Sequence, residues 1–136
     1  MPTAGLLVDT DVLSYIAWKR PQAQAFLPLV VGKLLVISFV TVGEMCFGAA
    51  NRGWGERRIS EMEKILRRYT TIPGTYDVAQ HYGRVRKAFR DQVGENDTWV
   101  AATALAHELP VVTNNLKHFE PMSERLGFSL VHPDRP

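Results

Sequence analysis

The stretch Gly5-Leu6-Leu7-Val8-Asp9 decides the fold class, because a short apolar run ends there on a carboxylate and a helical pattern follows at once. Leu34–Ser38 is a second run of this kind, rich in β-branched residues and preceded by the turn residues Gly32-Lys33. Continuous apolar runs of this length are typical of strands buried on both faces of a parallel sheet. Shorter candidates for further strands follow at Thr70–Ile72, Pro110–Thr113 and Phe128–Val131.

Helical patterns fill the intervals between these strands, and the alternation predicts an α/β fold. We expect one domain, residues 1–136, with a central, mainly parallel sheet of about five short strands flanked by helices. Pro28 should kink or end the second helix, Gly94–Asn96 should be a loop, and the tail His132–Pro136 should fray. The expected helices are Asp11–Lys19, Gln22–Val31, Thr41–Asn51, Glu56–Tyr69, Tyr76–Gln92, Asp97–His107 and Leu116–Leu126.

Composition excludes several classes of protein. The 136 residues are 46% hydrophobic and 22% charged, with a net charge of +2, as in ordinary globular domains. No apolar run is long enough to span a membrane, and the start lacks the basic segment of a signal peptide. The single cysteine, Cys46, excludes an internal disulfide and a cysteine-based zinc site, and we expect it to be buried. These features predict a cytoplasmic protein.

Three carboxylates, Asp9, Glu44 and Asp97, are far apart in the sequence but each lies near a junction between a strand or loop and a helix. The carboxyl ends of parallel strands meet at one edge of the sheet, so these acids should converge there. Neighbouring carboxylates repel one another unless a cation neutralises them. Oxygen ligands favour Mg²⁺, and the absence of paired His or Cys residues at ligand spacing argues against zinc.

Each acid also has a purely structural interpretation. Asp9 and Asp97 could be N-terminal caps of the helices that follow them. Glu44 completes Thr41-Val42-Gly43-Glu44, which matches a capping box. A helix N-terminus stabilises a carboxylate without competing for a metal, so capping and metal binding are compatible.

Four stretches of the chain, taken in order, resemble the signature motifs of PIN-domain ribonucleases, and most closely those of VapC-type toxins of toxin–antitoxin pairs. They are Leu6-Leu7-Val8-Asp9-Thr10-Asp11-Val12-Leu13, Ser38-Phe39-Val40-Thr41-Val42-Gly43-Glu44, Asn96-Asp97-Thr98-Trp99-Val100-Ala101-Ala102-Thr103-Ala104 and Val112-Thr113-Asn114-Asn115-Leu116-Lys117-His118-Phe119. One such motif is weakly specific, whereas four in order across nearly the whole chain are strongly specific.

The resemblance implies that Asp9, Glu44 and Asp97 bind Mg²⁺ or Mn²⁺ and that Asn115 occupies a fourth catalytic position, where an acid is frequent. An Asn gives this site one negative charge fewer than four acids would. The same resemblance places hydroxyl and carboxylate side chains beside these groups, namely Thr10, Asp11, Ser38 and Thr113.

The implied function is a metal-dependent endoribonuclease that hydrolyses phosphodiester bonds of structured RNA. The resemblance further implies a toxin inhibited by an antitoxin, and a homodimer, with Val42–Trp54 and Glu56–Tyr69 as candidate partner surfaces. Clustered basic residues could hold RNA phosphates. Trp54 and Tyr76 could stack on bases or pack at helix ends, whereas Trp99 should belong to the core. The candidate phosphate-binding residues are Arg52, Arg57, Arg84 and Lys87.

Three other functions agree with parts of the sequence. A phospho-accepting receiver domain shares the α/β pattern, but Thr70–Ile72 leads into Pro73 without an acid, and Val131 leads into His132-Pro133 without a lysine. A haloacid-dehalogenase phosphatase would share Asp9-Thr10-Asp11 but not the Val12-Leu13 that follows. A catalytically weak PIN-like interaction module remains an alternative because of Asn115.

Overall fold

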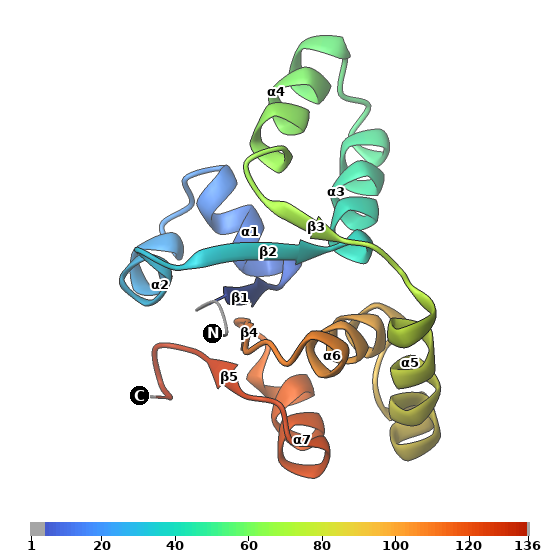
Figure 1. Cartoon of the computed structure of the whole chain (residues 1–136). Helices are drawn as coiled ribbons and strands as arrows, with labels where there is room; N and C mark the ends of the chain where they lie inside the picture. Colours follow the sequence, from blue (N-terminus) through green and yellow to red (C-terminus); the bar gives the residue numbers. More distant parts are fainter. Residues whose placement is uncertain (1–4, 136) are drawn as a thin grey trace.

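A computed structural model describes residues 5–135, and its centre is a five-stranded parallel sheet with strand order β3-β2-β1-β4-β5 (Figure 1). The predicted fold class is thereby confirmed. β1 is the middle strand and pairs with β2 on one side and β4 on the other. The strands are β1 (Gly5–Val8), β2 (Leu34–Ser38), β3 (Thr70–Ile72), β4 (Val111–Val112) and β5 (Leu130–Val131).

Seven α-helices within residues 5–135 cover the two faces of the sheet, with a 3₁₀ turn, η1 (Arg90–Gln92), after α5. Two helices, α3 and α6, begin two residues earlier than the sequence predicts, and α1 begins one residue earlier. The Ser38 side chain accepts a hydrogen bond from the Val40 N–H and starts α3 at Phe39, and α6 starts after Gly94, inside the expected loop. The α-helices are α1 (Thr10–Ala17), α2 (Ala23–Val30), α3 (Phe39–Asn51), α4 (Glu56–Leu66), α5 (Tyr76–Phe89), α6 (Glu95–His107) and α7 (Leu116–Leu126).

Alternate residues of β1 bury into two separate cores, one on each face of the sheet. Leu7 belongs to a cluster with residues of α5, α6 and α7, whereas Leu6 and Val8 pack with residues of α1, α2, α3 and α4. Since both faces are covered, the central strand is apolar throughout. This sandwiched strand fixes the position of Asp9, the first residue beyond it.

Two expectations about burial are wrong. Cys46 is exposed, because α3 packs through Met45 and Ala49 and therefore turns Cys46 outward. Trp99 is only half-buried and lies outside the core, where it stacks on Tyr82 with ring centroids 4.0 Å apart.

The tail is held in place within the described residues instead of fraying. His132 is buried and forms an isolated β-bridge with Arg135, whose side chain donates a hydrogen bond of 2.9 Å to Glu120. Pro136 lies outside the described residues. Across residues 5–135, the helices are all too short or too polar to cross a membrane.

Candidate active site

Asp9 lies at the carboxyl edge of the sheet, between two neighbouring strands, and both of its oxygens accept hydrogen bonds. Oδ1 accepts from the Thr10 N–H at 2.9 Å, and Oδ2 accepts from the Thr113 hydroxyl at 2.8 Å. Asp9 thus caps α1, as its structural interpretation predicts, and is only 6% exposed. Ser38 and Thr113 end or follow the strands beside it, so the parallel sheet brings these three residues to one edge.

Glu44 reaches the same edge from inside α3. Its Oε1 accepts a hydrogen bond of 2.7 Å from the Thr10 hydroxyl, which also lies 3.0 Å from the Thr41 hydroxyl. The capping-box interpretation is wrong, because Ser38 caps α3 and Glu44 lies beyond its first turn. Thr10 therefore links the start of α1 to the Glu44 carboxylate.

Asp97 lies in the first turn of α6, so it is not the N-terminal cap of that helix; Gly94 takes that place. Its Oδ2 is 3.2 Å from the Nδ1 atom of His118 in α7. The same Nδ1 is 2.8 Å from the Asn115 side-chain nitrogen. The structure thus joins Asp97 and Asn115 through a histidine that the sequence motifs did not single out.

Asp11 is fixed between α1 and the loop after β4. One oxygen accepts from the Val12 N–H at 2.7 Å and the other from the Asn114 N–H at 3.1 Å. The Asn115 N–H in turn donates to the Thr113 hydroxyl at 3.0 Å. These hydrogen bonds tie the loop after β4 to the acids that follow β1.

The electrostatics of this edge are those of carboxylates without counter-ions. Burial raises the pKa of Asp9 from 3.8 to about 7, and the charges of Asp11 and Asp97 add to the effect. Burial also raises the pKa of Asp11, with Asp97 and Glu44 contributing. Within residues 5–135 no lysine or arginine forms an ion pair with any of these four acids, and His118 is the one basic side chain beside Asp97.

The donor set suits a hard divalent cation, because it consists of carboxylate, amide and hydroxyl oxygens. Over the described part of the chain, no three His, Cys, Asp or Glu side chains are close enough to hold a metal by themselves. Mg²⁺ usually keeps several waters and shares its shell with substrate phosphates. A cation at this edge would therefore rely on one or two of these carboxylates, with water and phosphate completing its coordination.

A groove beside the acids runs between α1, α3 and α4 and encloses a cavity of about 890 Å³. Thr10 and Glu44 line one part of it, and Trp18 and Trp54 line another, with their rings edge to face at 5.2 Å. Arg52 and Arg58 lie over the Trp54 ring at 5.9 and 5.8 Å. The groove is therefore aromatic and basic at one part and acidic at another.

The predicted RNA-binding residues form two sets rather than one. Arg52 and Arg57 lie at α3 and α4, and Arg57 forms an exposed ion pair of 3.4 Å with Glu61. Arg84 and Lys87 are exposed on α5, and Figure 1 places α4 and α5 at opposite ends of the molecule. Of the two aromatic candidates for base stacking, Trp54 packs in the groove and Tyr76 is 80% exposed.

Comparison with known proteins gives consistent results. The model of the PIN domain family matches residues 6–122. Ribonuclease VapC2 of Haemophilus influenzae is 33% identical over 118 residues, which cover 84% of this chain and 89% of the relative. The tRNA(fMet)-specific endonuclease VapC of Shigella flexneri is 29% identical over 118 residues, which cover the same shares of the two chains.

Solved structures agree with this similarity. The DNA-bound VapBC of Salmonella typhimurium matches with a TM-score of 0.78 and 25% identity, over 93% of this chain and 96% of that one. VapBC-1 of nontypeable Haemophilus influenzae matches with a TM-score of 0.76 and 25% identity, over 96% and 99% of the two chains.

Proposed function

Because the chain belongs to the PIN-domain family and is an endoribonuclease toxin of its VapC group, we propose that it hydrolyses RNA at the edge formed by Asp9, Glu44 and Asp97, with a divalent cation. One observation carries this proposal: buried and half-buried carboxylates share one edge of the sheet, and no lysine or arginine among residues 5–135 pairs with them. Mg²⁺ or Mn²⁺ would supply the missing positive charge.

The chain's own residues have distinct parts in this proposal. Asp9 is held by the Thr10 N–H and the Thr113 hydroxyl, so its oxygens are fixed before any substrate arrives. Thr10 also orients Glu44, and Asn115 offers a neutral oxygen. These oxygen atoms would hold the divalent cation, which would supply positive charge at the scissile phosphate and lower the pKa of a bound water. Asp97 on α6 and Glu44 on α3 are further carboxylates from which the cation could take a ligand.

The test of this function is cleavage of structured RNA with Mg²⁺, with EDTA, and by an Asp9→Ala variant. Wild type with Mg²⁺ should release defined fragments, whereas EDTA and Asp9→Ala should each abolish them. Val31→Ala is the matched control, because its side chain is 73% exposed and precedes β2, at the other edge of the sheet from the acids. Identical fragments from wild type and Asp9→Ala would refute the nuclease site and favour a catalytically weak interaction module.

An antitoxin is the expected protein partner, since VapC-type toxins belong to toxin–antitoxin pairs and this chain matches the two VapBC structures described above. We propose that an antitoxin segment occupies the groove between α1, α3 and α4. Apolar side chains of that segment would meet Trp18, Met45 and Met62, and a basic side chain would meet Glu44. Such a segment would cover one of the carboxylates that RNA cleavage needs.

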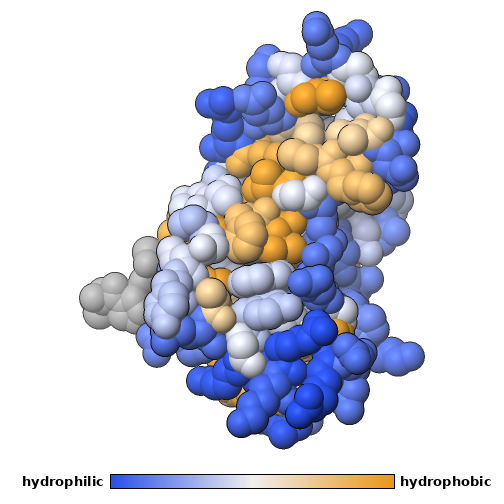
Figure 2. All heavy atoms as spheres, turned by 90° about the vertical axis from the view of Figure 1, so that its right-hand side faces the viewer, coloured by the Kyte–Doolittle hydropathy of each residue, from blue (hydrophilic) through white to orange (hydrophobic). Residues whose placement is uncertain are grey.

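We also propose that the chain forms a homodimer through the outer face of α3. Phe39 and Phe47 are 37% and 70% exposed on this helix, and Cys46 is exposed beside them. Figure 2 shows an apolar patch on the upper half of this side of the molecule, above a mainly hydrophilic lower half. A symmetric pair of such faces would bury the two phenylalanines of each copy.

For the RNA itself, we propose that the exposed basic side chains of Arg84 and Lys87 on α5 hold backbone phosphates. No ion pair engages either side chain within residues 5–135, unlike that of Arg57. Contacts of this kind are independent of sequence and weaken as salt rises.

A further inference from the structure

One imidazole nitrogen at the candidate site has two partners that make opposite demands on it. Nδ1 of His118 lies 2.8 Å from Nδ2 of Asn115 and 3.2 Å from Oδ2 of Asp97. An amide nitrogen is a donor, so it needs a lone pair on Nδ1. A carboxylate oxygen is an acceptor, so it needs a proton on the same atom. Nδ1 of a neutral imidazole can satisfy only one of them at a time.

The contact with Asn115 is shorter than the contact with Asp97, which indicates that Nδ1 forms its hydrogen bond with Asn115. With the lone pair on Nδ1, His118 accepts a hydrogen bond from Asn115 Nδ2, and its proton is on Nε2. The Asp97 oxygen then receives no hydrogen bond from His118 and faces its lone pair at 3.2 Å, a repulsion that a bound cation would offset. If Nδ1 instead carried the proton, it would meet the Asn115 N–H groups at 2.8 Å, donor against donor, unless the amide turned over.

The orientation of the amide matters because its two ends are chemically opposite. An amide oxygen is a good ligand for a hard cation, whereas the N–H groups repel one. Within the described residues the side-chain nitrogen of Asn115 is engaged by His118, and its side-chain oxygen, Oδ1, accepts no hydrogen bond. The oxygen is therefore the free end of the amide.

We propose that His118 is a positioning residue that holds the side-chain nitrogen of Asn115 and thereby keeps its side-chain oxygen, Oδ1, available to the cation. This inference rests on the proposed function, because it assumes that Asn115 contributes to the cation site. An aspartate at this position would need no such partner, since both of its oxygens can serve as ligands. His118 would thus compensate for an amide in place of an acid.

The test is a double-mutant cycle on Mn²⁺ affinity, measured by isothermal titration calorimetry on the protein without RNA. His118→Ala should weaken Mn²⁺ binding about tenfold, the usual range for a residue that orients a ligand. In an Asn115→Asp background, the same His118→Ala change should weaken binding less than about twofold. His118→Asn, whose side-chain oxygen can also accept a hydrogen bond, should recover part of the affinity of wild type.

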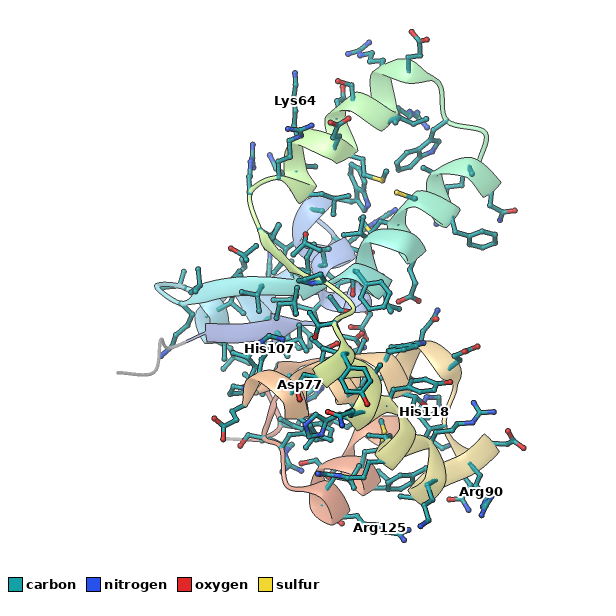
Figure 3. The ribbon with its side chains drawn as sticks, turned by 45° about the vertical axis from the view of Figure 1, so that its right-hand side comes forward. Lys64, Asp77, Arg90, His107, His118 and Arg125 are labelled. Atoms are coloured by element: carbon teal, nitrogen blue, oxygen red, sulfur yellow. The ribbon has the colours of Figure 1, made fainter. Side chains whose placement is uncertain are left out.

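Two controls separate positioning from a general loss of structure. His107→Ala removes an exposed histidine from the other end of α6, away from His118 (Figure 3), and should leave Mn²⁺ affinity unchanged. Thermal unfolding of each variant without metal shows whether it folds. His118 is 49% exposed, so its removal should leave the fold intact.

The outcomes are distinguishable. An equal loss in the wild-type and Asn115→Asp backgrounds would overturn the positioning role, because His118 would then act independently of the amide. No loss in either background would overturn it as well. If wild type itself bound no Mn²⁺, the proposed metal-dependent function would be refuted, and this inference with it.

Discussion

Replacing Asp9 with asparagine should stabilise the metal-free protein, although it removes the central acid of the candidate site. Burial and the charges of Asp11 and Asp97 raise the pKa of Asp9 from 3.8 to about 7. The folded protein therefore favours the protonated form of Asp9. The stability that protonated Asp9 contributes to the fold is fully present below pH 3.8 and is lost as the pH rises through about 7.

The magnitude follows from that shift. One pKa unit corresponds to about 1.4 kcal/mol, so a shift from 3.8 to about 7 makes the ionised Asp9 cost the fold about 4 kcal/mol above pH 7. Between pH 5 and pH 8 the wild type should therefore lose about 2–3 kcal/mol more stability than Asp9→Asn. An asparagine can still accept the hydrogen bond that the Thr10 N–H donates, so the variant retains its cap on α1.

The assay is urea unfolding in EDTA at pH 5 and pH 8, repeated with Mg²⁺. Asp91→Asn is the control, because it removes one charge from a side chain that is 95% exposed. Mg²⁺ should stabilise the wild type at pH 8 and have little effect on Asp9→Asn. Parallel pH dependences for wild type and Asp9→Asn would refute the reasoning, since Asp9 would then carry no cost of burial.

Four further predictions concern the rest of the molecule. Asp97→Asn should keep the melting temperature of wild type, because Gly94 is the N-cap of α6, but should slow RNA cleavage at least about tenfold. Trp54→Ala should weaken antitoxin binding by about 2 kcal/mol, measured by calorimetry, because the groove loses an aromatic wall. Phe47→Glu should convert dimer to monomer in analytical ultracentrifugation, because the new carboxylates of the two copies would be buried close together where their α3 helices meet. Replacing Arg84 and Lys87 with glutamine should weaken RNA binding and reduce its salt slope by about two.

Each of these has a matched control or a contrary result. Tyr76→Ala should leave antitoxin binding unchanged, and an equal loss there would count against the groove. Val31→Glu, at a side chain 73% exposed outside α3, should leave the dimer intact. Lys33→Gln, on the turn before β2, lies at the edge of the sheet opposite the acids and should not change the salt slope. Unfolding of Asp97→Asn would show that its role is structural.

The sequence predicts the sheet well because its strands are decided locally. Leu34–Ser38 is a β-branched apolar run bounded by turn residues, and the structure has β2 with these same limits. Asp9 could be placed at the strand end for the same reason. Helix starts are harder to predict, because they depend on which residue satisfies the first N–H groups. Ser38 does this for α3, ahead of the Thr41 that the capping-box pattern favours.

The two errors at α3 and α6 have one origin. A helix that is apolar on several sides does not reveal from sequence which side faces the core. On α3 both Met45 and Phe47 are apolar, yet Met45 is 7% and Phe47 70% exposed. Trp99 on α6 is likewise apolar but half-exposed against Tyr82.

His118 could not be found from the motifs because its role depends on a contact across the fold. Its contact with Asp97 joins residues 21 positions apart, and no local pattern predicts it. Only its contact with Asn115 could have been predicted, because residues three positions apart lie on the same face of a helix and these two are at the start of α7.

The hydrogen bond between Thr113 and Asp9 spans 104 positions of the chain, and β4, which brings Thr113 to that place, is only two residues long. Most of the polypeptide must therefore be synthesised before Asp9, which follows β1, meets the loop after β4. A nascent chain that ends before Thr113 already has Asp9, Glu44 and Asp97, but it lacks the hydroxyl that holds Asp9 and the histidine beside Asp97. The candidate site is therefore complete only when nearly the whole chain has been synthesised.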